Sequence, residues 1–126
     1  MQKILCVDDD SFVRKMLSFN FENVGIENVM CSNGFDALEK LEQDSYDLAI
    51  LDIMMPQMDG FTLYEEMRTK NISTPVIFLT AKVAEHSLIQ GLELGAEDYI
   101  TKPFRLNELN IKVKRILERQ ALATKH

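Results

Sequence analysis

Five polar residues stand at the ends of short apolar runs in this sequence: Asp8, Asp9, Asp52, Thr80 and Lys102. Three are carboxylates, which repel one another when they are gathered at one place without a cation. Mg²⁺ relieves such repulsion, and its preferred ligands are carboxylate, water and phosphate oxygens. A hydroxyl and an ammonium group nearby would complement the acids. These residue types predict a divalent-cation site, provided that the fold brings the five residues together.

The runs themselves alternate with segments of helical periodicity. We expect strands at residues 3–7, 27–31, 48–51, 76–79 and 97–101, and helices near residues 11–24, 35–41, 60–67, 84–94 and 106–121. The third and fourth runs are continuously apolar, which is typical of strands that helices cover on both faces of a parallel sheet. Strictly alternating strands and helices predict such an α/β sheet. Because parallel strands end at one edge, the five polar residues are expected to meet there.

The apolar residues of the helices predict which faces pack on the sheet. In the first helix most of them fall at helical spacing, and we expect this set to form its inner side: Phe12, Val13, Met16, Leu17, Phe19 and Val24. In the second helix the expected apolar face consists of Phe35, Leu38 and Leu41. Asp10 or Ser11 is expected to cap the first helix.

Length and composition narrow the class of protein. A chain of 126 residues predicts one domain, and 46% hydrophobic residues can form a substantial core. The net charge of −6 argues against direct nucleic-acid binding by this segment. We expect a cytoplasmic protein, because neither a membrane span nor a secretion signal is evident. Cys6 and Cys31 are expected to be buried free thiols, with a disulfide or metal pair as the less favoured alternative.

The polar residues lie in motifs that resemble those of the receiver domain of bacterial two-component response regulators. The motifs are Asp8-Asp9, Asp52 followed by Ile-Met-Met-Pro, Thr80-Ala81 and Lys102-Pro103-Phe104. The resemblance extends over residues 3–118 and is greatest for receivers attached to winged-helix DNA-binding domains. It implies a flavodoxin-like doubly wound (βα)5 fold with five parallel strands in the order 2-1-3-4-5. We expect residues 1–122 to form this domain and residues 123–126 to form a C-terminal tail.

The resemblance also implies roles for the acidic residues. Asp52 would be the phosphoacceptor, taking a phosphoryl group from a sensor histidine kinase to form an aspartyl phosphate. Asp9, Asp52 and the backbone carbonyl of Met54 would bind Mg²⁺ or Mn²⁺, and Asp8 would act through a water molecule. The domain would catalyse its own phosphoryl transfer and dephosphorylation without being a conventional turnover enzyme.

The remaining motifs imply a switch. Lys102 would pair with a phosphoryl oxygen, and Pro103 resembles the cis-proline that directs this lysine inward. The hydroxyl of Thr80 would turn toward the new phosphoryl group, and Tyr99 would rotate into the space that this movement vacates. Phosphorylation would thus bias a two-state packing through added charge and acceptor oxygens.

The related receivers dimerise through their fourth helix, fifth strand and fifth helix, using ion pairs between subunits. Gln90 stands where a basic residue would be expected, which leaves one such pair in doubt. The alternative is a solvated charged face, since exposed ion pairs contribute little. The candidate residues of a dimer face are Glu97, Asp98, Glu108, Lys112, Arg115 and Arg119.

The expected function is therefore two-component phosphorelay signalling that regulates transcription through an attached or partner effector. One alternative is a stand-alone receiver that acts by binding other proteins. A Mg²⁺-dependent hydrolase with an aspartyl-phosphate intermediate is less favoured, because Met54 stands where such enzymes carry a second aspartate. A flavin- or nucleotide-binding module would need a glycine-rich loop after the first strand. A receiver that is never phosphorylated would not need the full set of acids and lysine.

Overall fold

A computed structural model describes residues 2–81 and 95–124 of the chain. It contains a five-stranded parallel sheet in the order β2-β1-β3-β4-β5, which confirms the predicted class and strand order. The strands are β1 (Lys3–Val7), β2 (Glu27–Cys31), β3 (Leu48–Asp52), β4 (Val76–Ala81) and β5 (Asp98–Lys102). The described helices are α1 (Ser11–Asn23), α2 (Gly34–Gln43), α3 (Gly60–Thr69) and α5 (Leu106–Thr124). The helix predicted at residues 84–94 lies outside the described residues.

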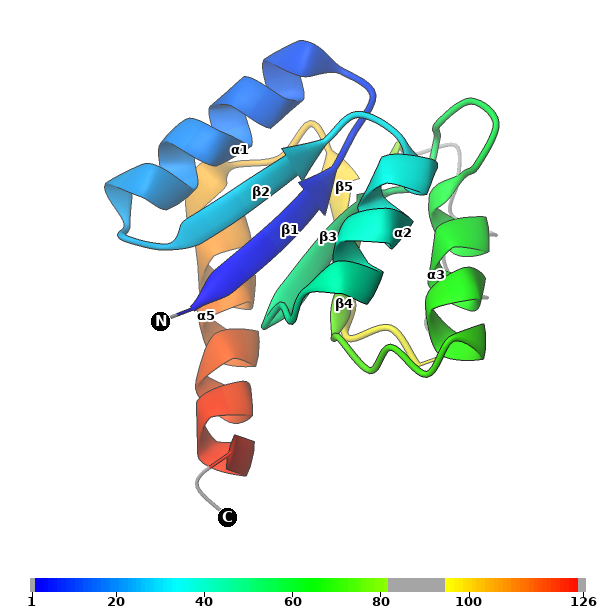
Figure 1. Ribbon diagram of the computed structural model, residues 1–126. Coiled ribbons are helices and arrows are strands. Elements are labelled where there is room, and N and C mark those ends of the chain that lie inside the picture. Colours follow the sequence, from blue (N-terminus) through cyan, green and yellow to red (C-terminus); the bar gives the residue numbers. More distant parts are fainter. Residues whose placement is uncertain (1, 82–94, 125–126) are drawn as a thin grey trace.

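Helices cover both faces of the sheet, as Figure 1 shows, with α1 and α5 on one side and α2 and α3 on the other. Each side has its own apolar core. Leu17 and Phe21 of α1 pack with the α5 stripe against one face, whereas Ala37 of α2 and Met67 of α3 pack against the opposite face. The α5 stripe is the predicted one, namely Leu109, Val113, Ile116 and Leu117.

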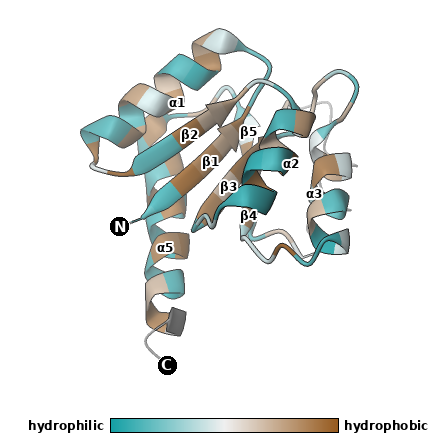
Figure 2. Ribbon diagram, viewed as in Figure 1, coloured by the Kyte–Doolittle hydropathy of each residue, from teal (hydrophilic) through white to brown (hydrophobic). Residues whose placement is uncertain are grey.

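The central strands are apolar throughout because neither face meets solvent. Every residue of β3 is buried, and so are the last four of β1 and the first five of β4. In Figure 2 the hydrophobic colour is concentrated on these strands, while the helices carry hydrophilic stretches on their outer sides. This pattern is the one expected for parallel strands between two helical layers.

Side-chain caps start the three helices that follow β1, β2 and β3. Asp10 accepts a hydrogen bond from the amide of Phe12, which confirms the predicted cap of α1. Asn33 caps α2 by accepting a hydrogen bond from the amide of Asp36, and Asp59 caps α3 by accepting one from the amide of Thr62. Each cap satisfies an amide that the helix leaves without a backbone partner. The caps thus fix where the chain turns away from the sheet edge.

The predicted inner faces of α1 and α2 were partly wrong. Phe12 and Phe19 are 73% and 67% exposed, and Phe35 is 54% exposed. The buried residues of α1 are instead Leu17, Phe21 and the polar Asn20, whose amide exchanges hydrogen bonds of 2.8 and 3.0 Å with Asn110 of α5. Apolar residues extend over rather more than half of the circumference of α1, so periodicity alone could not decide which side meets the sheet. Val24, predicted to face inward, is also exposed.

Several element ends differ by a few residues from the prediction. β5 begins at Asp98, one residue later than expected, and α5 continues to Thr124 instead of ending near residue 121. Both cysteines are buried free thiols, as predicted. Cys6 and Cys31 belong to cores on opposite faces of the sheet, and burial raises the pKa of both, to about 11 for Cys31. In residues 2–81 and 95–124, no helix has the length and apolar character to span a membrane.

Candidate functional site

Three carboxylates meet at the C-terminal edge of the sheet, and we call Asp8, Asp9 and Asp52 the acidic edge. One ligand oxygen from each of the three lies within 4.8 Å of the others. Asp8 is 0% exposed and Asp52 is 3% exposed, whereas Asp9 faces solvent. The predicted convergence of these acids is therefore present. Hard divalent cations bind such oxygen clusters.

The strands and the loops that follow them fix these side chains. β1 and β3 are hydrogen-bonded neighbours with Val7 opposite Leu51, so that Asp8, just after β1, lies beside Asp52, the last residue of β3. One carboxylate oxygen of Asp8 accepts a hydrogen bond of 2.9 Å from the amide of Asp10. An oxygen of Asp52 accepts a longer one, of 3.3 Å, from the amide of Met54.

Lys102 supplies positive charge to the acidic edge. Its Nζ donates to an oxygen of Asp8 at 2.7 Å and lies 3.5 Å from an oxygen of Asp52. Burial acts to lower the pKa of this ammonium group, but the hydrogen bond to Asp8 and the charge of Asp52 outweigh burial, and the pKa is raised. The group is therefore charged at neutral pH. The peptide bond between Lys102 and Pro103 is cis, as the resemblance implied.

Asp52 has an unusual protonation equilibrium. Burial, followed by repulsion from Asp8 and a smaller repulsion from Asp9, raises its pKa from 3.8 to about 7, and the nearby charge of Lys102 opposes this rise only in part. Perturbed carboxylates of this kind are concentrated at functional sites. A bound cation would remove the repulsion, and the charged carboxylate could then act as a nucleophile toward phosphorus.

The two predicted switch residues lie on neighbouring strands. Thr80 is buried near the end of β4, and its hydroxyl donates to the carbonyl of Ala81 at 3.0 Å. Tyr99 lies opposite Phe78 in the register of β4 and β5, and its partly buried ring packs against the core beneath α2 and α3. Thr80 lies one residue before the end of β4 and Tyr99 lies three residues before Lys102, whereas their roles as a switch stay a prediction.

The model of the response regulator receiver domain family matches residues 4–114 of the chain. The chain belongs to this family. It is 42% identical over 122 residues to the alkaline phosphatase synthesis transcriptional regulatory protein PhoP of Bacillus subtilis (strain 168), an alignment that covers 97% of this chain and 51% of PhoP. It is 38% identical over 117 residues to the transcriptional regulatory protein RprY of Bacteroides fragilis, covering 93% of this chain and 50% of RprY. The chain thus spans about half the length of these relatives.

Solved structures agree with this assignment. The receiver domain of the Francisella response regulator 1452 superposes with a TM-score of 0.88 at 38% identity, covering 94% of this chain and 98% of that one. A response regulator receiver domain protein from Clostridium thermocellum superposes with a TM-score of 0.91 at 27% identity, covering 98% and 99% of the two chains. The predicted family and its place in two-component phosphorelay signalling are therefore confirmed.

Two further residues shape the site of this receiver domain: Arg14, which sequence reasoning missed, and Gly60, which it assigned to the loop after the third strand. Arg14 donates from Nη1 to the backbone carbonyl of Asp8 at 2.7 Å, and so ties α1 to the end of β1. Gly60 lies so close to β3 that an added Cβ would stand 2.5 Å from the carbonyl oxygen of Asp52 and 2.9 Å from the Cα of Ile53. A basic residue one turn into the first helix was the only sequence signal for Arg14.

Four of the six charged residues of the candidate dimer face form ion pairs inside the receiver domain. Lys112 lies 3.2 Å from an oxygen of Asp98, and Arg119 lies 2.7 Å from an oxygen of Glu97. Both pairs join α5 to β5 or to the residue before it. These contacts lie within one chain, so dimerisation through this face stays a prediction.

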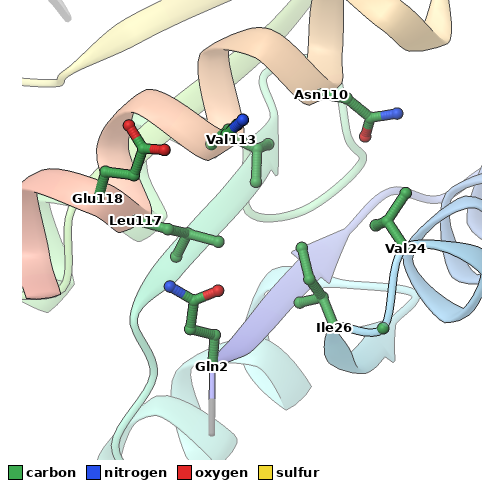
Figure 3. A pocket seen from close by; sticks show the side chains of 9 residues that line it. Gln2, Val24, Ile26, Asn110, Val113, Leu117 and Glu118 are labelled. Atoms are coloured by element: carbon green, nitrogen blue, oxygen red, sulfur yellow. The ribbon is translucent and has the colours of Figure 1, made fainter.

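A separate hollow of about 440 Å³ lies at the other end of the sheet, where α1 and α5 meet the starts of β1 and β2 (Figure 3). Apolar side chains of α5 face it, together with residues that precede the two strands. It is remote from the acidic edge, because parallel strands begin and end at opposite edges. Its labelled lining residues are Gln2, Val24, Ile26, Asn110, Val113, Leu117 and Glu118.

Proposed function

We propose that this receiver domain accepts a phosphoryl group on Asp52 from a phosphohistidine of a sensor kinase. The observation that supports the proposal best is the geometry of the acidic edge, whose three ligand oxygens lie within 4.8 Å of one another beside the ammonium group of Lys102. In the transfer, a carboxylate oxygen of Asp52 attacks phosphorus, the phosphorus–nitrogen bond breaks, and the histidine nitrogen departs with the bonding electrons. Such catalysis needs positioning and positive charge more than it needs further covalent chemistry.

The chain provides these two requirements. Asp9, Asp52 and the backbone carbonyl of Met54 would hold Mg²⁺ or Mn²⁺, with Asp8 acting through a water molecule. When bound, the cation would offset negative charge on the oxygens of the transferring group. Lys102, already between two carboxylates, would move its hydrogen bonds to a phosphoryl oxygen. The carboxylate pair that it leaves would then depend on the cation for neutralisation.

The same transfer would operate the output. Thr80 would exchange its bond to the Ala81 carbonyl for one to a phosphoryl oxygen, and Tyr99 would follow inward. The altered face of β5 and α5 would favour a homodimer. Because the relatives include transcriptional regulators, we propose that the dimer controls transcription through an attached or partner effector.

Intact-mass measurement tests the phosphoacceptor. Incubation with acetyl phosphate and Mg²⁺ is expected to add one phosphoryl group to the chain, and Asp52→Asn is expected to abolish the addition. Asp36→Asn, a change at an exposed acid in the first turn of α2 that is not one of the three acids of the acidic edge, is the matched control and retains full labelling. Undiminished labelling of the Asp52→Asn variant would refute the assignment.

A further inference from the structure

At the edge of the sheet formed by β5, side chains provide hydrogen-bond partners for the backbone of Tyr99. Among the strands that the structure describes, β5 is an edge strand with β4 as its one partner, and such strands leave backbone groups facing outward. Here the amide of Tyr99 donates to an oxygen of Asp98 at 2.8 Å, and its carbonyl accepts from Nζ of Lys112 at 2.9 Å. Both backbone groups of the switch tyrosine therefore have partners in one acid and one base.

Lys112 makes three contacts with this short stretch of strand. Besides the carbonyl of Tyr99, its Nζ lies 3.2 Å from an oxygen of Asp98 and 5.4 Å from the centroid of the Tyr99 ring. A cation within about 6 Å of a ring centroid is attracted by the π-system. The side chains of Lys112 and Asp98 are only 24% and 28% exposed, so that solvent screens the pair less than it screens a surface pair.

Lys112 also links the two layers of the molecule. Its helix, α5, packs through Leu109 and Val113 into the core on one face of the sheet. The ring of Tyr99 packs against the core on the other face. The ammonium group of Lys112 must therefore pass around the edge of β5 to contact that ring. Because of this contact, the interactions of the Lys112 side chain depend on the orientation of the Tyr99 ring.

We infer that Lys112 is a positioning residue that holds Tyr99 in its resting orientation and thereby sets how readily the switch operates. This inference rests on the proposed function, because it concerns the movement of Tyr99 that follows phosphorylation. If the ring turns inward, it forfeits the attraction of the ammonium group, while the bond to its carbonyl can persist. Linkage then requires that weakening the resting orientation favours phosphorylation to the same degree.

Fluorine NMR of the chain labelled with 3-fluorotyrosine tests the inference. The chain has three tyrosines, and Tyr99→Phe assigns the resonance of interest. Lys112→Met keeps the aliphatic stem and removes the charge. Without phosphoryl donor, it is expected to shift the Tyr99 resonance toward the position that the unmodified chain takes with acetyl phosphate and Mg²⁺. At one sub-saturating acetyl phosphate concentration, the ratio of phosphorylated to unphosphorylated chain should rise about threefold, as expected for losing a cation–π contact.

Three variants separate positioning from a general structural effect. Lys112→Arg keeps the charge and is expected to retain the wild-type resonance and the wild-type ratio of phosphorylated to unphosphorylated chain. Asp98→Asn loosens the same lysine from its other partner and is expected to shift the resonance in the same direction as Lys112→Met. Lys114→Met removes an exposed lysine from the same helix and should change neither.

The possible results distinguish the inference from the proposed function. If the Tyr99 resonance of the unmodified chain moves on phosphorylation but that of resting Lys112→Met coincides with the resting wild type, Lys112 has no positioning role. If the unmodified chain is not phosphorylated, the proposed function fails. The resting spectra of the lysine variants would still decide whether Lys112 holds the ring.

Discussion

Asp52 is a buried carboxylic acid that must be ionised to act as a nucleophile. It is 3% exposed and adjoins Asp8 and Asp9, so the folded chain raises its pKa to about 7. A nucleophilic carboxylate must be ionised, and the cost of ionising Asp52 falls when a cation binds. The same repulsion that favours protonation therefore also favours metal binding. Lys102 is the intrinsic cation that makes the metal-free state tolerable.

The first prediction at this scale concerns pH and stability. The unfolded chain releases the Asp52 proton near pH 3.8, whereas the folded chain retains it until about pH 7. The free energy of unfolding contributed by this group is therefore highest below pH 3.8 and decreases as the pH rises to about 7. In EDTA, Asp52→Asn should remove this decrease and stabilise the chain at pH 8 by on the order of 1 kcal/mol.

Urea denaturation from pH 5 to pH 8 measures the effect, and Asp36→Asn serves as the control that keeps the wild-type slope. Equal slopes for Asp52→Asn and wild type would contradict a raised pKa at Asp52. Saturating Mg²⁺ should flatten the wild-type slope, since the cation favours the ionised carboxylates.

A second prediction concerns competition between Lys102 and the metal. The ammonium group lies 2.7 Å from Asp8 and 3.5 Å from Asp52, and like charges in a partly buried site repel. Lys102→Met should therefore raise the Mg²⁺ affinity about tenfold, equivalent to about 1.4 kcal/mol. Isothermal titration calorimetry measures this, with Lys102→Arg expected to bind as the wild type does. An unchanged affinity in Lys102→Met would show that the lysine does not oppose the cation.

At the scale of elements, the loop between β3 and α3 determines how the acceptor is presented. Asp59 caps α3, and the amide of Gly60 donates to the carbonyl of Ile53 at 3.0 Å. Helix α3 therefore begins in direct contact with the end of β3. A side chain at position 60 would meet backbone, which cannot move aside as a flexible side chain can.

Gly60→Ala tests this close approach. The added Cβ would stand 2.5 Å from the carbonyl oxygen of Asp52, so strand and helix must separate. We expect a loss of unfolding free energy of about 1–3 kcal/mol and weaker Mg²⁺ binding, since the loop also carries the Met54 carbonyl. Thr62→Ala, a change at an exposed position two residues further along α3, should alter Mg²⁺ binding little. Wild-type stability and affinity in Gly60→Ala would show that the contact is absent.

At the scale of the whole molecule, the ion pairs within one chain bear on assembly. Asp98 pairs with Lys112 and Glu97 pairs with Arg119, so these charges are already satisfied in the monomer. Glu108 and Arg115 are exposed on α5. A dimer that uses the charges of these two pairs must first break the pairs within each chain. Phosphorylation would need to supply the free energy of that exchange. We therefore expect the resting chain to be monomeric.

Light scattering after size exclusion provides the measurement. Acetyl phosphate with Mg²⁺ is expected to double the mass of the particle, and Arg115→Glu is expected to prevent the doubling without affecting phosphorylation. Lys114→Glu makes a similar charge change at the adjacent exposed residue and should still permit dimerisation. A phosphorylated wild type that stays monomeric would contradict the proposed dimer face.

Most of the fold was predictable because its signals are local. The unbroken apolar runs, the capping residues Asp10 and Asp59, and the regular alternation of strand and helix each require only a few neighbouring residues. The acidic edge followed from one rule, that parallel strands end on the same side. The inner face of α1 was partly mispredicted, because Phe12 and Phe19 satisfy helical periodicity as well as Leu17 does.

The sequence by itself determined the element order, the parallel sheet and the set Asp8, Asp9, Asp52 and Lys102. Only the tertiary structure decided that Lys102 bonds to Asp8 and that Lys112 reaches around the edge of β5 to Tyr99. Residue types and strand ends are local properties, and the chain states them directly. A contact between groups 94 or 13 residues apart depends on how whole elements pack, and no local pattern encodes that packing.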